Sequence, residues 1–179
     1  LPIYQVWACR RASGAGRQSP SFTRKPMVSV IVPTYNRPQP LRVALESLNR
    51  QRYQDFEVIV VNDGPTPIDS VIAEMNQQGR ITLVNHDRNR GLAASRNTGL
   101  RVAQGTYIAY LDDDDRLLPD HLGTLVEFLE RGTHQVAYTD AWRVKEQGIE
   151  GARLEVGRDQ PYAYDYDYQR LLVKNYIPV

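Results

Sequence analysis

The segment Thr106-Tyr-Ile-Ala-Tyr-Leu-Asp-Asp-Asp-Asp115 joins an apolar run to four consecutive aspartates. The apolar run predicts a buried strand, so the carboxylates are expected at its tip. At about 4 Å, two like charges repel by roughly 1 kcal/mol in water and about 4 kcal/mol at an effective dielectric of 20. A bound cation removes this repulsion, and an Asp-x-Asp pattern offers the hard oxygen ligands that Mg²⁺ or Mn²⁺ takes beside a phosphate.

Successive side chains of a strand point to opposite faces of the sheet. Asp112 and Asp114 are therefore expected on one face, and Asp113 and Asp115 on the other. Both pairs satisfy the Asp-x-Asp pattern, and the residues alone leave the choice open. The alternative interpretation is an acidic, solvated turn before a helix opened by Pro119.

Apolar runs alternate with segments of helical periodicity along the rest of the chain. Buried strands are predicted over residues 28–32, 56–61, 81–84, 107–111 and 135–138, with a hairpin over 142–156. Helices are predicted to begin at Pro38 and Pro119, and to cover residues 68–78, ended by Gly79, and 91–104, ended by Gly105. This order indicates an α/β, Rossmann-like fold, in which helices cover both faces of a mostly parallel sheet.

Charge is unevenly distributed along the 179 residues, which suffice for one domain with its own core. Residues 1–26 carry five basic side chains and no acidic one, and we interpret them as a basic arm or linker. The remainder carries 17 basic and 21 acidic side chains, a net charge of −4, which argues against nucleic-acid binding. A domain is predicted over residues 27–157, and residues 158–179 are interpreted as the start of another segment.

Two observations bear on the cellular location. No apolar run reaches the roughly 18 residues that a membrane-spanning helix needs. Cys9 is the only cysteine, so no disulfide can form within the chain. The expected location is the cytoplasm, with membrane association through the acceptor or another region left open.

Polar residues follow three of the predicted strands, and ligands of open parallel sheets bind outside these carboxyl ends. The first strand leads into Pro33-Thr-Tyr-Asn-Arg37, the second into Asn62-Asp63-Gly64, and the fourth into the aspartates. Tyr35 can stack on a base, Asp63 can accept a hydrogen bond from a base N–H, and the aspartates can hold a cation against a diphosphate. Each feature alone is also explained by an ordinary loop, but together they favour a nucleoside diphosphate site.

Arg96 is predicted on the apolar face of the helix over residues 91–104. That face is otherwise formed by Leu92, Gly99, Leu100 and Ala103. An arginine in such a place is costly unless it meets an anion. Two interpretations stay open: a structural pair with Asp63 or the aspartates, and direct contact with a phosphate or sugar. The start of the same helix, after Asn89-Arg90-Gly91, can also face an anion.

Four motifs occur in one order along residues 27 to 140. They are Val28-Ser-Val-Ile-Val-Pro-Thr-Tyr-Asn-Arg37, Val60-Val-Asn-Asp-Gly64, Asn89-Arg-Gly-Leu-Ala-Ala-Ser-Arg-Asn-Thr-Gly99 and Gly105-Thr-Tyr-Ile-Ala-Tyr-Leu-Asp-Asp-Asp-Asp115. This arrangement resembles family 2 glycosyltransferases of the GT-A fold. The resemblance implies a nucleotide-sugar donor, most often a uridine one, a divalent cation (Mn²⁺ or Mg²⁺), and inversion at the anomeric carbon.

The resemblance also implies roles for individual residues. The implied nucleotide-binding residues are Pro33, Thr34, Tyr35, Arg37, Asp63, Arg96, Asp112 and Asp113, and the implied metal ligand is Asp114. Asn62 and Pro65 stand where the family usually has Asp and Ser. Asp63 is present, so binding is still expected.

The reaction implied by the resemblance is a direct displacement, in which an acceptor hydroxyl gives its proton to a carboxylate. The family's base lies in a later acidic motif that does not occur before Val179, so the catalytic residue is left unassigned. We therefore expect a donor-binding portion of a longer protein, poorly active alone, with residues 158–179 beginning its acceptor side. Possible substitutes for the base are Asp140, Asp159, Asp165 and Asp167.

Other functions fit the residues less well. A nucleotidyltransferase would need a glycine-rich, basic loop after the first strand, and a dehydrogenase would need a third glycine after Gly14-Ala-Gly16. A non-catalytic nucleotide-sugar-binding module stays open as an alternative. The run Pro161-Tyr-Ala-Tyr-Asp-Tyr-Asp-Tyr168 is interpreted as an edge or loop, with a sugar pocket as the alternative, before a predicted helix over 169–175. His86, His121 and His134 are interpreted as structural or exposed.

Overall fold

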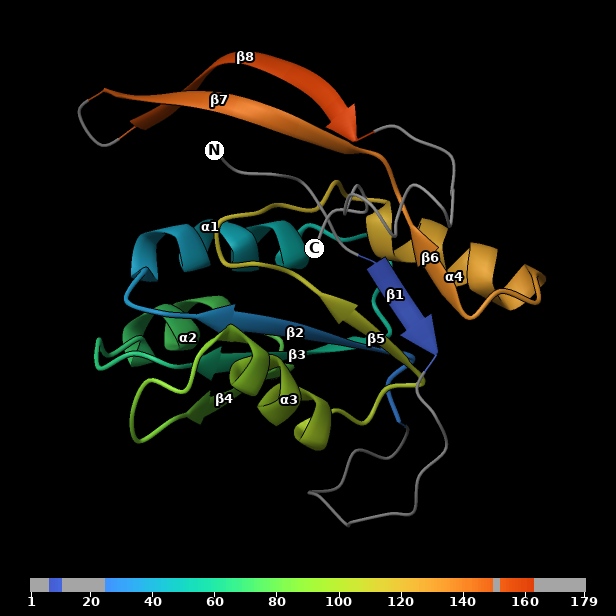
Figure 1. Cartoon of the computed structure of the whole chain (residues 1–179), viewed down its shortest axis with the longest axis horizontal. Helices are drawn as coiled ribbons and strands as arrows, with labels where there is room; N and C mark the ends of the chain where they lie inside the picture. Colours follow the sequence, from blue (N-terminus) through green and yellow to red (C-terminus); the bar gives the residue numbers. More distant parts are fainter. Residues whose placement is uncertain (1–6, 11–24, 150–151, 163–179) are drawn as a thin grey trace.

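The computed structural model describes residues 7–10, 25–149 and 152–162 (Figure 1). Its strands are β1 (Trp7–Arg10), β2 (Val28–Thr34), β3 (Phe56–Asn62), β4 (Ile81–Asn85), β5 (Tyr107–Tyr110), β6 (Val136–Tyr138), β7 (Ala141–Ile149) and β8 (Ala152–Tyr162). Six of them form one sheet in the order β4-β3-β2-β5-β1-β6, and β7 pairs with β8 in a separate ribbon. Strands β4, β3, β2 and β5 are parallel, whereas β1 is antiparallel to both of its neighbours.

Helices cover both faces of the central sheet, as the sequence predicts (Figure 1). They are α1 (Pro38–Asn49), α2 (Asp69–Met75), α3 (Leu92–Val102) and α4 (His121–Arg131). The larger core lies on one face, where α1, α2 and α4 pack on Val30 and Val32. On the other face, Ile31 and Ile59 pack against α3. Strand β2 is therefore apolar at consecutive positions because both of its faces are buried.

The predicted arm over residues 1–26 is corrected at Trp7–Arg10, which forms β1 inside the central sheet. The pairing partners of β1 are β5 and β6, both distant in sequence. A four-residue run carries too little periodicity to predict such a strand, because its stability comes from partners far along the chain. Residues 11–24 lie outside the described ranges. So do residues 163–179, which include most of the tyrosine-rich run and all of the helix predicted over 169–175.

Two helix ends differ from their predicted positions. Helix α2 ends at Met75, before the predicted Gln78, because the Asn76 side chain turns to β4: its Oδ1 accepts from the Ile81 N–H at 2.8 Å. Gly79 lies in the turn that follows, at φ 65°. Helix α3 ends at Val102, two residues before the predicted end. Among the described residues, no helix combines the length and the apolar character that crossing a bilayer requires.

A buried polar cluster stands near the amino ends of β2 and β3. Glu57 Oε1 accepts from the Ser29 hydroxyl at 2.6 Å and from the Gln104 N–H at 2.7 Å. Ser29 Oγ in turn accepts from the Gly105 N–H at 2.8 Å. A Cβ on Gly105 would stand 2.5 Å from the Ser29 nitrogen, so only glycine fits this approach. The cluster ties the chain just after α3 to the start of the sheet.

Gly99 sets the closeness of α3 to β2. A Cβ at Gly99 would lie 2.4 Å from Ile31 Cγ2. Gly99→Ala is expected to lower the free energy of unfolding by about 1 to 2 kcal/mol, because overpacking outweighs the gain in helix propensity. Urea unfolding measures this change. In the matched control Gly123→Ala on α4, the added Cβ meets Tyr53 Cβ at an ordinary 3.6 Å, and stability is expected to hold or rise. Equal effects of the two changes would contradict the tight packing of α3.

Candidate functional site

The carboxyl ends of β2, β3, β4 and β5 meet at one edge of the sheet, and backbone hydrogen bonds continue the ladder past them. The Asp63 N–H donates to the Thr34 carbonyl at 2.9 Å, and the His86 N–H donates to the Asn62 carbonyl at 2.9 Å. The Leu111 N–H donates to the Ile31 carbonyl at 3.0 Å. These bonds fix where each loop leaves the sheet, and so bring the predicted site residues to one rim.

The four aspartates form a turn and do not continue the strand, which corrects the expectation of a carboxylate-bearing strand tip. Strand β5 ends at Tyr110, and the Asp115 N–H donates to the Asp112 carbonyl at 3.0 Å. The expected alternation nevertheless persists in burial: Asp113 and Asp115 are buried, while Asp112 and Asp114 are partly exposed. We call residues 112–115 the aspartate turn.

Two arginines compensate the charge of the aspartate turn. Arg96 Nη2 donates to Asp112 Oδ1 at 2.9 Å, which selects the aspartates over Asp63 as the protein partner of Arg96. Arg37 contacts two carboxylates: Nη1 donates to Asp114 Oδ2 at 2.8 Å, and Nη2 lies 2.5 Å from Asp113 Oδ1. The repulsion foreseen from the sequence is thus relieved by side chains of the protein itself.

Asp113 is the most deeply buried member of the turn, with 0% exposure. Burial raises the pKa of Asp113; the Thr34 hydrogen bond and the Arg37 charge oppose this rise, and the neighbouring carboxylates add to it. Thr34 Oγ1 donates to Asp113 Oδ2 at 2.7 Å. Within the described residues Asp113 Oδ1 accepts no hydrogen bond of normal geometry, so its contact with Arg37 is an ion pair only.

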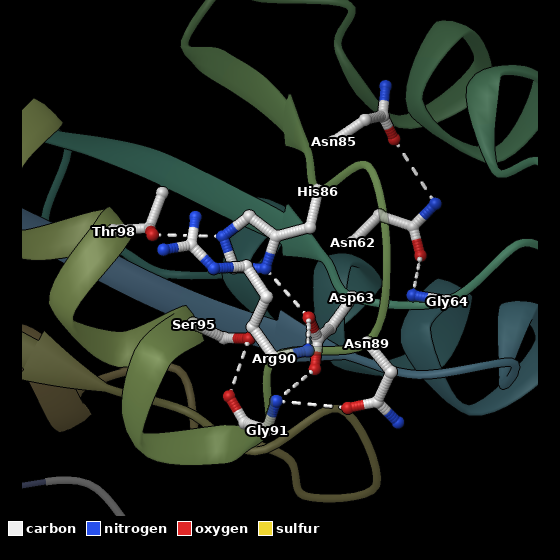
Figure 2. A network of polar contacts seen from close by, with 10 residues as sticks. All are labelled: Asn62, Asp63, Gly64, Asn85, His86, Asn89, Arg90, Gly91, Ser95 and Thr98. Atoms are coloured by element: carbon white, nitrogen blue, oxygen red, sulfur yellow. Dashed lines mark hydrogen bonds and ion pairs between the residues drawn. The ribbon is translucent and has the colours of Figure 1, made fainter.

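Asp63 is the centre of a second polar network (Figure 2). Its Oδ1 accepts from His86 Nδ1 at 2.7 Å and from the Arg90 N–H at 2.8 Å, and its Oδ2 accepts from the Gly91 N–H at 2.7 Å. Burial alone would raise the pKa of Asp63, but the hydrogen bonds from His86, Arg90 and Gly91 outweigh it and lower that pKa. Asp63 therefore fixes the loop over residues 86–91 and the start of α3.

His86 was not expected to take part in the site. A carboxylate only accepts hydrogen bonds, so Nδ1 of His86 carries a proton, and its Nε2 lies 2.9 Å from Thr98 Oγ1 on α3 (Figure 2). The available signal was positional: His86 directly follows β4, whose carboxyl end belongs to the same rim. The residue type alone, a single histidine, does not indicate that it lies at the rim.

The loops after β2 and β3 are locked together. Asn36 adopts φ 55°, and its Oδ1 accepts from the Thr66 hydroxyl at 2.8 Å. A Cβ on Gly64 would lie 2.5 Å from the same Asn36 oxygen, which explains the glycine there. Tyr35, in this loop, keeps 46% of its surface exposed and offers an accessible aromatic ring at the rim.

Asn62 uses both ends of its amide. Its Nδ2 donates to Asn85 Oδ1 at 3.1 Å and its Oδ1 accepts from the Gly64 N–H at 3.2 Å (Figure 2). The same Nδ2 also donates to the Thr66 carbonyl at 3.2 Å. An aspartate has no donor for the two bonds that Nδ2 makes. Asn62, which stands where the resemblance leads one to expect Asp, therefore has acceptors nearby that suit its amide.

Cation binding at this rim would rely on few carboxylates. No cluster of three or more metal-ligating side chains occurs among the residues that the structure describes. Asp114 is 42% exposed and is the outward-facing carboxylate of the Arg37 pair. Mg²⁺ is commonly held by one or two carboxylates together with substrate phosphates, and Asp114 fits that donor set.

The sequence model of glycosyl transferase family 2 matches residues 29–176. The chain belongs to this family. An uncharacterized glycosyltransferase of Rickettsia bellii is 34% identical over 134 residues, which cover 75% of this chain and 19% of that protein. The present family 2 chain therefore spans about a fifth of that relative's length.

Solved structures confirm the GT-A fold of this family 2 chain. The mannosyltransferase PcManGT from Pyrobaculum calidifontis, in complex with GDP-Man and Mn²⁺, is 32% identical with a TM-score of 0.54; the match covers 60% of this chain and 33% of that one. Residues 1–349 of S. aureus TarS, in complex with UDP-GlcNAc, are 25% identical with a TM-score of 0.57, covering 75% and 37%. The mostly parallel sheet predicted from the sequence is confirmed by the strand pairing of the structure and by these matches.

Proposed function

We propose that the chain forms the donor-binding part of a glycosyltransferase that moves a sugar from a nucleoside diphosphate to an acceptor hydroxyl, with inversion and with a divalent cation. The observation that carries the proposal is the shared rim, where the exposed ring of Tyr35 stands beside an aspartate turn compensated by Arg37 and Arg96. The complexes of PcManGT and TarS with nucleotide sugars support the same ligand class.

Each residue of the rim has a proposed task. Pro33, Tyr35 and Asp63 surround the base, with Tyr35 stacking on it. Asp63 Oδ2 takes one N–H from the loop over residues 86–91, which leaves a lone pair for a base N–H. Asp112 or Asp113 is assigned to the ribose or the sugar, and of the two Asp112 is the partly exposed one. Thr34 contributes by orienting Asp113 through its hydroxyl.

The proposed chemistry is an in-line displacement. An acceptor hydroxyl loses its proton to a carboxylate that stays unassigned, and its oxygen attacks the anomeric carbon on the face opposite the leaving diphosphate. Negative charge then grows on the diphosphate, where Arg37 can donate hydrogen bonds from the rim. A divalent cation bound beside Asp114 would further stabilise this charge.

Nucleotide binding tests the proposal directly. We expect UDP, GDP or dTDP, each screened with and without Mn²⁺, to raise the melting temperature of the chain, and one of them to do so most strongly with Mn²⁺. At a concentration of 100 times Kd, the stabilisation should be about 2.7 kcal/mol. Differential scanning fluorimetry measures the shift. An unchanged melting temperature with all three nucleotides would count decisively against the proposal.

A further inference from the structure

Arg37 differs from Arg96 in how it is held beside the aspartate turn. Arg96 is 19% exposed, bonds Asp112, and lies over the ring of Tyr110 at 5.4 Å, so packing fixes it. Arg37 is 49% exposed, and its partner Asp114 is 42% exposed. The Arg37–Asp114 pair therefore faces solvent, and solvent-exposed ion pairs change an equilibrium by only a few-fold.

The backbone on the amino side of Arg37 is anchored. Asn36 is held at φ 55° by its hydrogen bond with Thr66. Asp113 is also fixed, since it is buried and bonded to Thr34. Its contact with Arg37 Nη2 is an ion pair at 2.5 Å without hydrogen-bond geometry, and Asp113 keeps its bond from Thr34 when the guanidinium turns. The movable part of this cluster is thus the Arg37 guanidinium, together with the exposed carboxylate of Asp114.

We propose that Arg37 is an exchangeable counter-ion of the donor site. In the ligand-free chain its guanidinium neutralises Asp114; on donor binding it gives this carboxylate to the divalent cation and turns to the diphosphate. This inference rests on the proposed function. A guanidinium 2.8 Å from Asp114 Oδ2 would stand next to a cation on the same carboxylate, and the two positive charges repel. A diphosphate, in contrast, offers paired oxygens that match the two-pronged donor group of arginine.

The exchange predicts opposite effects of one substitution on two affinities. Without nucleotide, Arg37 competes with the cation, so Arg37→Gln is expected to bind Mn²⁺ about fivefold more tightly than the wild type. With saturating Mn²⁺, Arg37 serves the diphosphate, so the same variant is expected to bind UDP about tenfold more weakly. A merely structural arginine would not move the two affinities in opposite directions.

The experiment compares the wild type with Arg37→Gln and a charge-matched control. Arg101→Gln removes one positive charge from the exposed side of α3, away from the aspartate turn, and both affinities should stay within about twofold of the wild type. Electron paramagnetic resonance of free Mn²⁺ gives the metal affinity, and isothermal titration calorimetry gives the UDP affinity. Glutamine keeps a hydrogen-bond donor near Asp113, and circular dichroism verifies that each variant is folded.

The outcomes separate this inference from the proposed function. Tighter Mn²⁺ binding with weaker UDP binding by Arg37→Gln supports the exchange. Unchanged or weaker Mn²⁺ binding by this variant, including no detectable binding by either protein, overturns the exchange even if UDP binds with Mn²⁺. If Mn²⁺ binding tightens while UDP binds to none of the proteins, competition at Asp114 is supported and the proposed function fails.

Discussion

Replacing Asp63 with asparagine is expected to lower the free energy of unfolding by about 3 to 5 kcal/mol. Asp63 is 5% exposed, and its two oxygens accept three hydrogen bonds, two of them from backbone N–H groups. An amide replaces one acceptor oxygen by a donor, which leaves a buried N–H or the His86 proton without a partner. Removing one partner of such a buried set typically costs this amount. Urea unfolding followed by circular dichroism measures it.

Asp87→Asn is the matched control for Asp63→Asn. Asp87 lies in the same loop but is exposed, so its stability change is expected within about 0.5 kcal/mol. A similarly small change for Asp63→Asn would show that its hydrogen bonds do not support the loop over residues 86–91. Comparing the two variants therefore distinguishes the effect of losing a carboxylate in this loop from the effect of losing the hydrogen bonds of Asp63.

The pH dependence of stability should differ between the wild type and Asp63→Asn. Hydrogen bonds lower the pKa of Asp63 in the folded chain, so its contribution is fully present above the unfolded value of about 3.9. This contribution is lost as the pH falls from that value through the lower folded pKa. Over this acidic window, the wild type is expected to lose stability more steeply than the variant in urea unfolding at stepped pH.

Asp114→Asn is expected to weaken Mn²⁺-dependent nucleotide binding by about 100-fold or more. Asp114 is the exposed carboxylate that the proposal assigns to the cation, and even groups that only support a metal ligand typically contribute 10- to 100-fold. Nucleotide binding without Mn²⁺ should change little. Calorimetric titration of UDP with and without Mn²⁺ measures both. Because Asp114 is 42% exposed, the substitution should leave folding intact.

The control for Asp114→Asn is Asp69→Asn, at the exposed start of α2 and outside the aspartate turn. Its nucleotide affinity should equal that of the wild type with and without Mn²⁺. Mn²⁺-dependent binding that survives in Asp114→Asn would move the metal to another carboxylate of the turn, and Asp112→Asn would then be the variant to measure.

The strands and the rim were predictable because they depend on local pattern. A short run of β-branched apolar residues such as Val30, Ile31 and Val32 favours a strand buried on both faces. The parallel order of such strands then brings Tyr35, Asp63 and the aspartates to one edge without further information.

The partners of the aspartate turn were less accessible from the sequence. Arg37 and Asp114 are 77 residues apart, and nothing local indicates that they pair. The aspartates were expected at a strand tip because an apolar run leads directly into them, with a turn as the alternative; β5 in fact ends at Tyr110, before the first aspartate. His86 and β1 escaped prediction for a related reason: the roles of both depend on neighbours that only the folded chain supplies.

Carboxylates at the two ends of strand β3 bind the backbone at the two ends of helix α3. Near its start, Glu57 binds the Gln104 N–H just beyond α3, and directly after its end, Asp63 binds the Gly91 N–H at the helix start. A helix pinned at two points cannot slide along its axis, so Arg96 keeps a fixed depth beside the rim. Attempts to redesign the choice of nucleotide or sugar should therefore vary the Tyr35–Arg37 loop. Side chains placed on α3 would start from backbone positions that cannot shift to fit a new ligand.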